Sequence, residues 1–595
     1  MAVRLIASTV LVFGCTQGDS ELVADGDFEG IDEASQALSD LRTRCSALVA
    51  GTVTCTLTDG DIAMFVRART TITVNGFAIA SSTTLKKLAI VGSDGANTVI
   101  LDYMGGMFAL GSSSATSRIA IDLRGGADVV KIRGSAGADN YVAGAGASGT
   151  GGAIAINGDS FADITLANVE LFAVSLGDGA DSFHGRGNPA TGNAPFVGAI
   201  QVFGGDGADR LGGGDGDDLL SGGDGNDTFT TGAVADGADD YHGDDGVDTV
   251  DYSSRSASHP VTVRMDGTDS GDDSGAEADR IALDVENLKG SAGDDVLTGN
   301  AAANVISGMA GDDILDGGAG NDTLNGNDGA DTFVEAATAS GADVFNGGAG
   351  IDTATYGART TSVTVILDGL ANDGSLAEGD KVMTDVENVI GSATAPNAIT
   401  GSTGANRLVG GSANDTISGN AGNDVILGGA GDDILNGDAG DDTFDEEASA
   451  NGADVFNGGL GVDTVTYAGR GDAGESITVT MDGVAANDGQ TDTDGVEGGA
   501  LVSEADNVKS DVENLIGSNC AAGDTITGNA AANQLSGGAG DDTLTGGSGD
   551  DVLRGDAGND TLICGADDDI ATFDGSDVDA DGDGLCEVKN SAETH

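Results

Sequence analysis

Residues 308–334 read GMAGDDILD, GGAGNDTLN and GNDGADTFV, which are three consecutive nine-residue windows of one pattern. Each window begins with Gly, carries Gly fourth and Asp sixth, and has a large apolar residue eighth. Seventeen windows of the chain follow this pattern, with Ala413 replacing the fourth Gly once and Ala354 the eighth residue once. So strict a period predicts a solenoid in which successive windows stack on one another.

Each position of the window has a mechanical reason. Gly lets the backbone turn through positive φ and brings carbonyl groups close together. The Asp supplies a hard oxygen ligand of the kind that Ca²⁺ takes. The three residues after it alternate, as in Thr323-Leu324-Asn325, so a short strand sends one side chain inward. We therefore predict an all-β fold, a parallel β-roll whose turns bind calcium. The predicted ligands in the windows are Asp209, Asp218, Asp227, Asp248, Asp295, Asp313, Asp322, Asp331, Asp352, Asp415, Asp424, Asp433, Asp442, Asp463, Asp542, Asp551 and Asp560.

Over residues 204–572 these windows resemble the RTX or haemolysin-type calcium-binding repeats of bacterial proteins. The resemblance implies a coil of two nonads, with Ca²⁺ held between turns that stack on the same edge. Asp313 would then pair with Asp331, and Asp424 with Asp442, while Asp433 would share its edge with Asp415. The resemblance implies no reaction, because this module is appended to proteins of many activities.

A larger unit recurs on top of the nonads. It consists of Asp-Thr-x-x-Tyr, a strand-like run, an acidic loop and Val-Glu-Asn, the last at residues 285–287, 386–388 and 512–514. The chain therefore divides into four nonad blocks joined by three β-rich inserts, whose alternating residues predict strands that continue one elongated roll. The blocks are 204–251, 290–355, 391–466 and 517–572. Three windows replace the Asp by Asn304, Asn406 or Asn533, and we expect these turns to close by hydrogen bonds with little or no metal.

Residues 16–203 carry fainter versions of the unit, for example in Gly92–Ile100, Gly134–Val142 and Leu176–His184. Alternating apolar runs such as 119–123 lie between them. This pattern predicts a degenerate β-solenoid that caps the regular roll, because a stack of repeats must end in an atypical one. A separate small β-domain is the alternative.

The tail, residues 573–595, carries a second kind of acidic pattern. It resembles the calcium loop of thrombospondin type 3 and dockerin repeats, with alternating acidic residues around a Gly turn. The predicted ligands there are Asp579, Asp581, Asp583 and Glu587. A solvated acidic tail without metal is the alternative.

Composition excludes several kinds of partner. The chain has 99 acidic and 24 basic residues, a formal net charge of −75, which argues against nucleic acid or an anionic membrane surface. High charge, 102 Gly and no Trp would also suit a disordered chain. The strict phase of the apolar residues decides against disorder in the presence of calcium. No apolar run has the length that spans a membrane.

Catalytic motifs are absent from the sequence. The four His residues form no His-Glu-x-x-His, and no Gly-x-Ser-x-Gly occurs. Metal binding explains the many Asp residues better than paired acid and base catalysis does. We therefore expect a protein that is not an enzyme and has no catalytic residues.

The N-terminus and the cysteines bear on location. Residues 1–15 read as a signal segment, and Val12-Phe13-Gly14-Cys15 also resembles a lipoprotein processing site that would lipidate Cys15. Cys45 with Cys55, and Cys564 with Cys586, suggest disulfides and an oxidising compartment, while Cys520 is left over. We expect an extracellular or outer-surface bacterial protein.

The sequence thus predicts a secreted or cell-surface calcium-binding repeat protein with a structural or adhesive role. Its expected partners are calcium ions and cell-surface or matrix polymers. One alternative is a secreted exoenzyme or effector whose active part lies in residues 16–203. Another is a carbohydrate- or ice-binding solenoid, although the mixed ninth residues of the windows argue against a regular ice-binding face.

Overall fold

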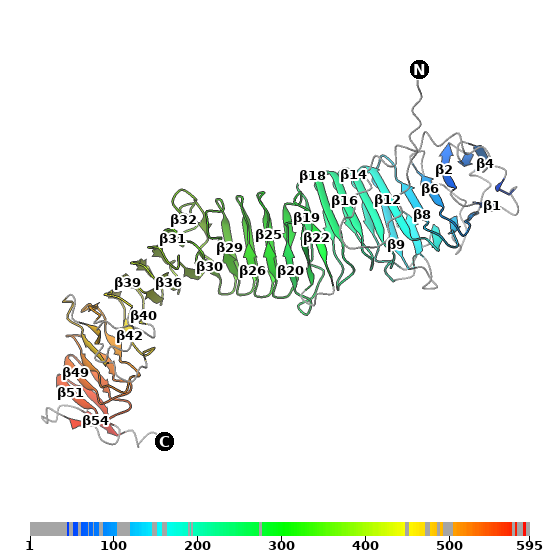
Figure 1. Ribbon diagram of the computed structural model, residues 1–595. Coiled ribbons are helices and arrows are strands. Elements are labelled where there is room, and N and C mark those ends of the chain that lie inside the picture. Colours follow the sequence, from blue (N-terminus) through cyan, green and yellow to red (C-terminus); the bar gives the residue numbers. More distant parts are fainter. Residues whose placement is uncertain are drawn as a thin grey trace. The chain divides into compact units, whose positions relative to one another are not determined.

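The computed structural model describes most of the repeat region and parts of both ends (Figure 1). The described residues are 44–46, 52–57, 61–68, 71–74, 77–81, 87–103, 119–145, 152–156, 163–188, 191, 194–272, 277–446, 451–470, 476–484, 488–491, 504–573, 578–579 and 587–590. All secondary-structure elements in these ranges are strands. The all-β fold class predicted from the sequence is confirmed.

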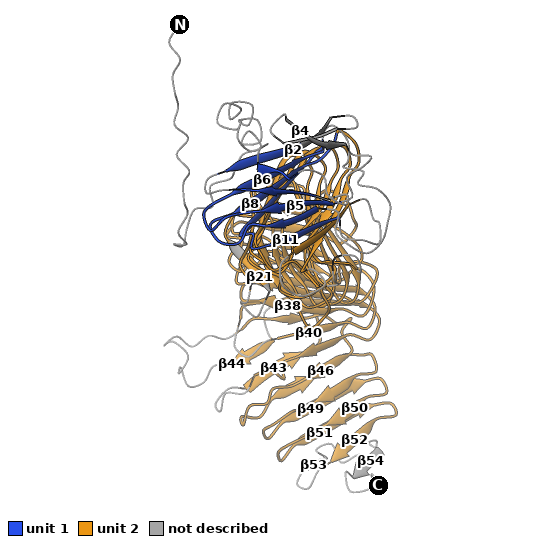
Figure 2. Cartoon of the chain, turned by 90° about the vertical axis from the view of Figure 1, so that its right-hand side faces the viewer, with its two compact units in different colours: residues 1–135, 163–177 blue, residues 136–162, 178–595 orange. Residues whose placement is uncertain are grey.

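The chain forms two compact units, coloured separately in Figure 2. The first comprises residues 1–135 and 163–177, and the second comprises residues 136–162 and 178–595. The boundary that the sequence suggests after residue 203 lies inside the second unit.

The first unit is a roll of short strands. Parallel pairs join β1 (Thr52–Thr56) to β5 (Lys87–Val91), β5 to β7 (Ile119–Asp122) and β7 to β11 (Ile164–Ala167). A second parallel series runs from β2 (Ile62–Ala68) through β6 (Thr98–Asp102) and β8 (Val129–Arg133) to β12 (Leu171–Asp178). The strands β3 (Thr71–Val74) and β4 (Phe77–Ser81) add an antiparallel edge to β2. The described strands of the first unit thus show the parallel stacking that the degenerate repeats predict, together with an antiparallel hairpin of β3 and β4.

The second unit consists of parallel strands whose register follows the nonads. Val296 of β24 (Val296–Thr298) lies opposite Ile314 of β26 (Ile314–Asp316), and Val305 of β25 (Val305–Ala310) lies opposite Thr323 of β27 (Thr323–Asp328). Each partner is two nonads further along the chain. The coil of two nonads is therefore confirmed, and consecutive nonads contribute to alternate sheets.

Three long runs of parallel strands build this unit. The first is β9 (Asn140–Gly144), β13 (Ser182–His184), β15 (Arg210–Gly212), β17 (Thr228–Thr230), β19 (Thr249–Asp251), β23 (Asn287–Lys289), β25, β27, β29 (Val344–Ala349) and β33 (Lys381–Val382). The second is β20 (Val261–Arg264), β24, β26, β28 (Thr332–Val334), β30 (Thr353–Thr355), β34 (Asn388–Ile390), β36 (Arg407–Gly411), β38 (Val425–Gly429), β40 (Thr443–Asp445), β42 (Thr464–Thr466), β46 (Asn514–Ile516), β48 (Gln534–Ser536), β50 (Val552–Arg554), β52 (Ile570–Phe573) and β54 (Glu587–Asn590). The third is β31 (Val363–Ile366), β35 (Ala398–Thr400), β37 (Thr416–Ser418), β39 (Ile434–Ala439), β41 (Val455–Leu460) and β45 (Asn507–Val508).

Two shorter runs complete the parallel sheets of the second unit. One is β14 (Ile200–Asp206), β16 (Leu219–Gly225), β18 (Asp240–Gly246) and β22 (Asp279–Ile281). The other is β43 (Ser476–Thr480), β47 (Thr525–Thr527), β49 (Thr543–Ser548), β51 (Thr561–Ala566) and β53 (Val578–Asp579). In the N-terminal part of the second unit, β10 (Gly152–Ile156) pairs antiparallel with β9.

The inserts are the places where one run ends and another begins. β22, β33 and β45 each end a run, whereas β20, β31 and β43 each begin one. Each starting strand also pairs antiparallel with a short strand of the same insert: β21 (Asp269–Asp272), β32 (Gly374–Ser375) or β44 (Gly489–Thr491). The strands expected in the inserts thus continue the roll.

The core of the second unit is a ladder with one large side chain per nonad. In β27 and β28 the middle residues Leu324 and Phe333 are buried while their neighbours are half-buried. Phe333 stacks on Phe345 with ring centroids 5.4 Å apart. This apolar column is thin, because each coil adds only two such side chains, so it contributes modest hydrophobic stabilisation per residue ordered.

Candidate metal centre

The nonad Asp side chains form ladders along both edges of the roll. The Asp313 N–H donates to Asp331 Oδ1 at 2.9 Å, and the Asp424 N–H donates to Asp442 Oδ1 at 2.8 Å. On the other edge, the Asp415 N–H donates to Asp433 Oδ1 at 2.7 Å. The structure therefore brings together the pairs that the two-nonad coil requires. All seventeen predicted nonad Asp residues are buried.

In most Asp residues of the ladders, one carboxylate oxygen has no hydrogen-bond partner among the described residues. Oδ1 closes the coil, but Oδ2 is buried and accepts no hydrogen bond from any described residue. This holds for Asp209, Asp227, Asp248, Asp313, Asp322, Asp331, Asp352, Asp415, Asp424, Asp433, Asp442, Asp463, Asp542 and Asp551. Buried polar atoms normally have partners, and an unpartnered carboxylate oxygen is costly. Rows of such oxygens at coil spacing suit a hard divalent cation, so the residues present fit calcium.

The first Gly of each nonad leaves room beside that free oxygen. A Cβ at Gly410 would collide with Asp415 Oδ2 and with the carbonyl oxygen of Gly428, two nonads on. The same collision with its own Asp would occur at Gly326. The space that Gly keeps open is thus bordered by a carboxylate and a carbonyl oxygen, the two kinds of ligand that Ca²⁺ takes from proteins.

The fourth Gly of the nonad is required by the backbone conformation instead. Gly329 has φ +150, and a Cβ there would collide with the carbonyl oxygen of Gly311. Only Gly combines that torsion with that close approach.

The electrostatics of the ladders favour a bound cation. Burial, with the neighbouring carboxylates adding to it, raises the pKa of Asp313 to about 8 and that of Asp433 to about 7. The same causes raise the pKa of Asp442 to about 6. The folded edge therefore resists holding these carboxylates in their charged form unless a positive charge lies between them.

Asp560 accepts the Asp542 N–H at Oδ1 at 2.8 Å and so joins the ladder, whereas two other predicted ligands, Asp218 and Asp295, differ from the fourteen. Asp218 Oδ2 accepts from the Gly214 N–H at 2.6 Å, and Asp295 Oδ2 accepts from the Ser291 N–H at 2.5 Å. Their Oδ1 atoms also accept backbone N–H groups, from Ile200 and Val261. Both oxygens of these two Asp residues are thus engaged by the protein.

The Asn residues that replace Asp in three windows are satisfied by hydrogen bonds. Asn304 Oδ1 accepts from the Asn300 N–H at 2.8 Å, and Asn304 Nδ2 donates to the Glu286 carbonyl at 2.9 Å. Asn533 makes the equivalent bonds to Asn529 and Glu513. These turns close as the sequence suggested, by hydrogen bonds of the side-chain amide.

The ladders include residues that the sequence pattern missed. Asp239, Asp343 and Asp454 accept the backbone N–H of Asp218, Asp322 and Asp433. Each lies in a window with Gly fourth, Asp sixth and an aromatic residue eighth, but without the first Gly. A search that omitted the first Gly would have found them. Asp569 also accepts the Asp551 N–H at 2.8 Å.

The Val-Glu-Asn triplets also belong to the ladders. The Oε2 atoms of Glu286, Glu387 and Glu513 accept the N–H groups of Asp248, Asp352 and Asp463, each at 2.9 Å. The longer Glu side chain takes the place of a nonad Asp where the insert returns to the roll.

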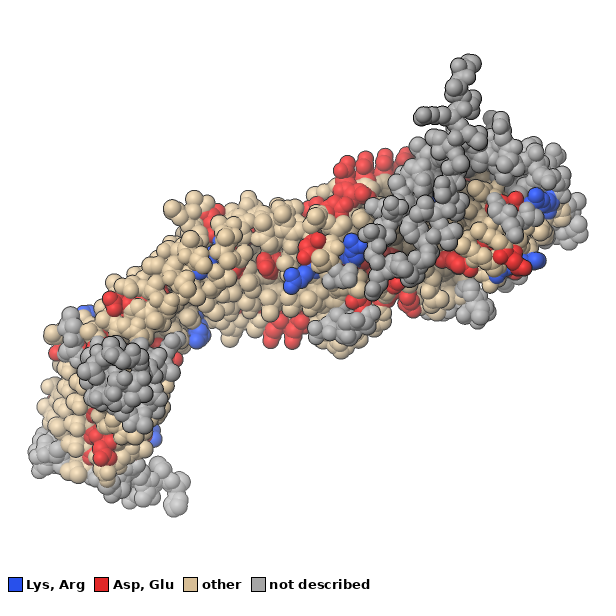
Figure 3. Space-filling view, viewed as in Figure 1, with Lys and Arg blue, Asp and Glu red and all other residues tan. Residues whose placement is uncertain are grey.

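Acidic side chains also gather on the surface. Asp206, Asp224 and Asp245 are exposed and occupy the same register in β14, β16 and β18. Figure 3 shows short rows of acidic side chains and few basic ones.

Several predicted residues lie at or beyond the limits of the described part. Asp579 lies in β53 and Glu587 in β54, but their side chains are not described, and Asp581, Asp583, Cys586 and Cys15 lie outside the described residues. Cys45 is joined to Cys55 by a disulfide, Cys564 is disulfide-bonded, and Cys520 is buried. In the part of the chain that the structure describes, no helix is long and apolar enough to cross a membrane.

The fold and the ladders define a parallel β-roll whose turns present carboxylate and carbonyl oxygens to calcium. A family model described as RTX calcium-binding nonapeptide repeat (4 copies) matches ten segments of the chain. They are residues 122–148, 203–237, 284–315, 298–333, 338–354, 400–435, 409–444, 450–468, 521–553 and 537–571. The chain therefore carries repeats similar to the RTX calcium-binding nonapeptide repeat, and the first matched segment begins ahead of residue 204. A comparison with curated proteins gives no match.

The different roles of Asn304 and Asp322 lead to a prediction about calcium stoichiometry. Asn304→Ala should leave the number of bound ions unchanged, because its side chain only closes a turn. Asp322→Ala should lose about one ion or bind it clearly more weakly, because it removes an unpartnered oxygen. Calcium counted by native mass spectrometry of the full chain checks both variants. Loss of a whole ion in Asn304→Ala would show that the Asn turns are metal sites.

Proposed function

We propose that this protein works outside the bacterial cell as a structural or adhesive element whose roll folds when several calcium ions bind. The observation that carries the proposal is the double row of buried, unpartnered Asp oxygens. In the cytoplasm calcium is scarce, so the carboxylates would repel one another and the chain would stay unfolded and fit for export. Outside, each ion would add two positive charges to a folded edge only, so its binding energy would act as folding energy.

The cysteines and the N-terminal segment support the same location. The Cys45–Cys55 disulfide suits an oxidising compartment, and residues 1–15 have the pattern of a signal segment, with or without lipidation at Cys15. Partners would be surface or matrix polymers. The proposal assigns no catalysis, because metal binding and coil closure explain the carboxylates.

Protease treatment of intact producing cells tests the proposal. We expect the full-length chain in the medium or on the cell surface, resistant to proteinase K in millimolar calcium and rapidly digested after addition of chelator. An intracellular protein serves as the control for lysis. Retention of the chain inside intact cells, or digestion at the same rate in calcium and in chelator, would contradict the proposal. Binding of the calcium-loaded chain to isolated surface polymers, with and without residues 1–203, would then identify the adhesive part.

A further inference from the structure

Seven threonines of the second unit form two rows on one short run of strands. The run is β43, β47, β49 and β51, which pair in parallel. Each strand contains Thr-x-Thr at the same register, except that β51 contains Thr-Leu-Ile. The first row is Thr478, Thr525, Thr543 and Thr561, and the second row is Thr480, Thr527 and Thr545. We call these seven residues the threonine array.

The threonine array faces the solvent. Between the two rows, each strand places one residue that is fully buried, such as Ile526 or Leu544. Because side chains alternate along a strand, the threonines on either side of it point outward. Thr478 and Thr525 are exposed, and the other five are half-buried. Among the described residues, the outward positions of the four strands carry no charged and no aromatic side chain. This face therefore consists mainly of methyl and hydroxyl groups.

The strands fix the distances between these groups. Neighbouring strands lie about 4.8 Å apart and a strand rises about 3.3 Å per residue, so the array repeats at about 4.8 Å along each row and about 6.6 Å between the rows. The oxygen atoms of an ice surface also repeat in two directions at regular intervals of this order. A layer of water bound to the array can therefore match the crystal.

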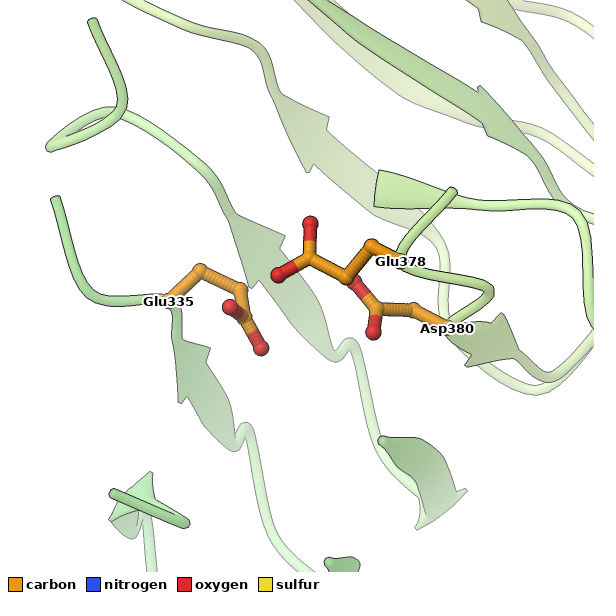
Figure 4. A group of neighbouring side chains, drawn as sticks. All are labelled: Glu335, Glu378 and Asp380. Carbon is orange, nitrogen blue, oxygen red and sulfur yellow. The ribbon is translucent and has the colours of Figure 1, made fainter. Parts of the chain in front are cut away.

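Polar groups elsewhere in the roll are engaged by the chain itself. The buried carboxylates of Glu335, Glu378 and Asp380 lie close together in the second insert (Figure 4), yet each accepts a hydrogen bond from a neighbouring residue. The strand β30 also reads Thr-x-Thr, but Thr353 Oγ1 accepts from an Asn side chain and Thr355 Oγ1 accepts from a backbone N–H, both at 3.2 Å. These oxygens are thus occupied within the protein.

The hydroxyls of the threonine array differ, because the protein does not use them. No residue in the described part of the chain hydrogen-bonds to the hydroxyl of any of the seven threonines. Each hydroxyl can both donate to and accept from water. The array thus presents unused hydrogen-bonding groups in a regular pattern.

Uniform composition sets this face apart from a longer run. In the run of β36, β38 and β40, one row contains Arg407, Val425 and Thr443. The mixed ninth residues of the windows argue against an ice-binding face on the roll as a whole. That objection does not apply to the array, whose second row is Thr in three successive strands. A polysaccharide fits less well, since the face offers no aromatic ring on which a sugar could stack.

We propose that the threonine array binds ice. Its methyl groups and hydroxyls hold a layer of ordered water at the spacing that the strands set, and this layer joins the crystal. The proposal rests on the function proposed above, since it names ice as a surface to which the calcium-folded protein adheres outside the cell.

Capture of the calcium-loaded full chain by ice tests this assignment. Fluorescently labelled protein is mixed with slowly growing ice, and the captured fraction is measured after washing. The wild type should be enriched in the ice. Thr527→Lys should lose most of the capture, because a long charged side chain in the second row holds the face away from the crystal. The matched control is Thr400→Lys, which changes a half-buried ninth residue of a nonad outside the array and should keep the capture.

Three results would overturn the proposal. They are wild-type capture no greater than that of a fluorescent protein without affinity for ice, equal losses in the two Lys variants, and adsorption to chitin or cellulose without adsorption to ice. Circular dichroism in saturating calcium checks that each variant is folded. If Thr527→Lys folds poorly, Thr478→Lys at an exposed position of β43 gives the same test. A folded chain that does not adsorb to ice would leave the calcium-dependent roll untouched.

Discussion

Removal of calcium at pH 7.5 and physiological salt is expected to abolish most of the β-structure of residues 204–572. The ladder carboxylates repeat at every coil, closer together than the Debye length of about 8 Å, so salt does not screen them. An Asp whose pKa is about 7 rather than 3.8, such as Asp433, costs the folded state about 4 kcal/mol above pH 7, since one pKa unit is worth about 1.4 kcal/mol. Because such costs recur along both ladders, they offset a large part of a domain stability of about 5–15 kcal/mol.

A circular dichroism titration of the full chain from chelator to millimolar calcium checks this expectation. The β-signal should rise cooperatively with calcium, and magnesium serves as the control, because it demands a smaller octahedral shell and dehydrates reluctantly. A β-spectrum that stays unchanged in excess chelator would mean that the roll stands without its metal.

Acidification of the calcium-free chain from pH 7.5 to pH 5 is expected to restore part of the β-structure. Burial, with neighbouring carboxylates adding to it, raises the pKa of Asp322 and Asp542 to about 7. The unfolded chain has the ordinary value of 3.8, so between these values the folded state binds more protons. Stability therefore falls as pH rises through this window and recovers as pH falls.

The measurement is circular dichroism in calcium-free buffer, kept above pH 5 because the isoelectric point is about 4.1. In saturating calcium the dependence should reverse, since protons compete with the metal for the same oxygens. If the β-content stays constant or declines on acidification without calcium, repulsion between the ladder carboxylates is not what keeps the metal-free chain unfolded.

The sequence alone determined the structural features that follow from the nine-residue repeat. The nonads fixed which side chain of each strand points inward, as at Leu324, and which turns carry Asp. These are local constraints, so a few residues suffice to impose them. The two-nonad coil was implied only by the resemblance to RTX repeats, and the pairing of Val296 with Ile314 confirms it.

The tertiary structure decided what depends on long separations. Asp343 joins its ladder after a coil lengthened by three residues, and Glu387 joins after a whole insert. The cluster of Glu335, Arg359 and Glu378 gathers residues from both ends of an insert. The sequence separation between these three residues follows no fixed spacing, because the insert loop can have any length. Only the stacking of its flanking strands is constrained. Coil-on-coil hydrogen bonding sets where the insert must return, and that return brings the buried charges together.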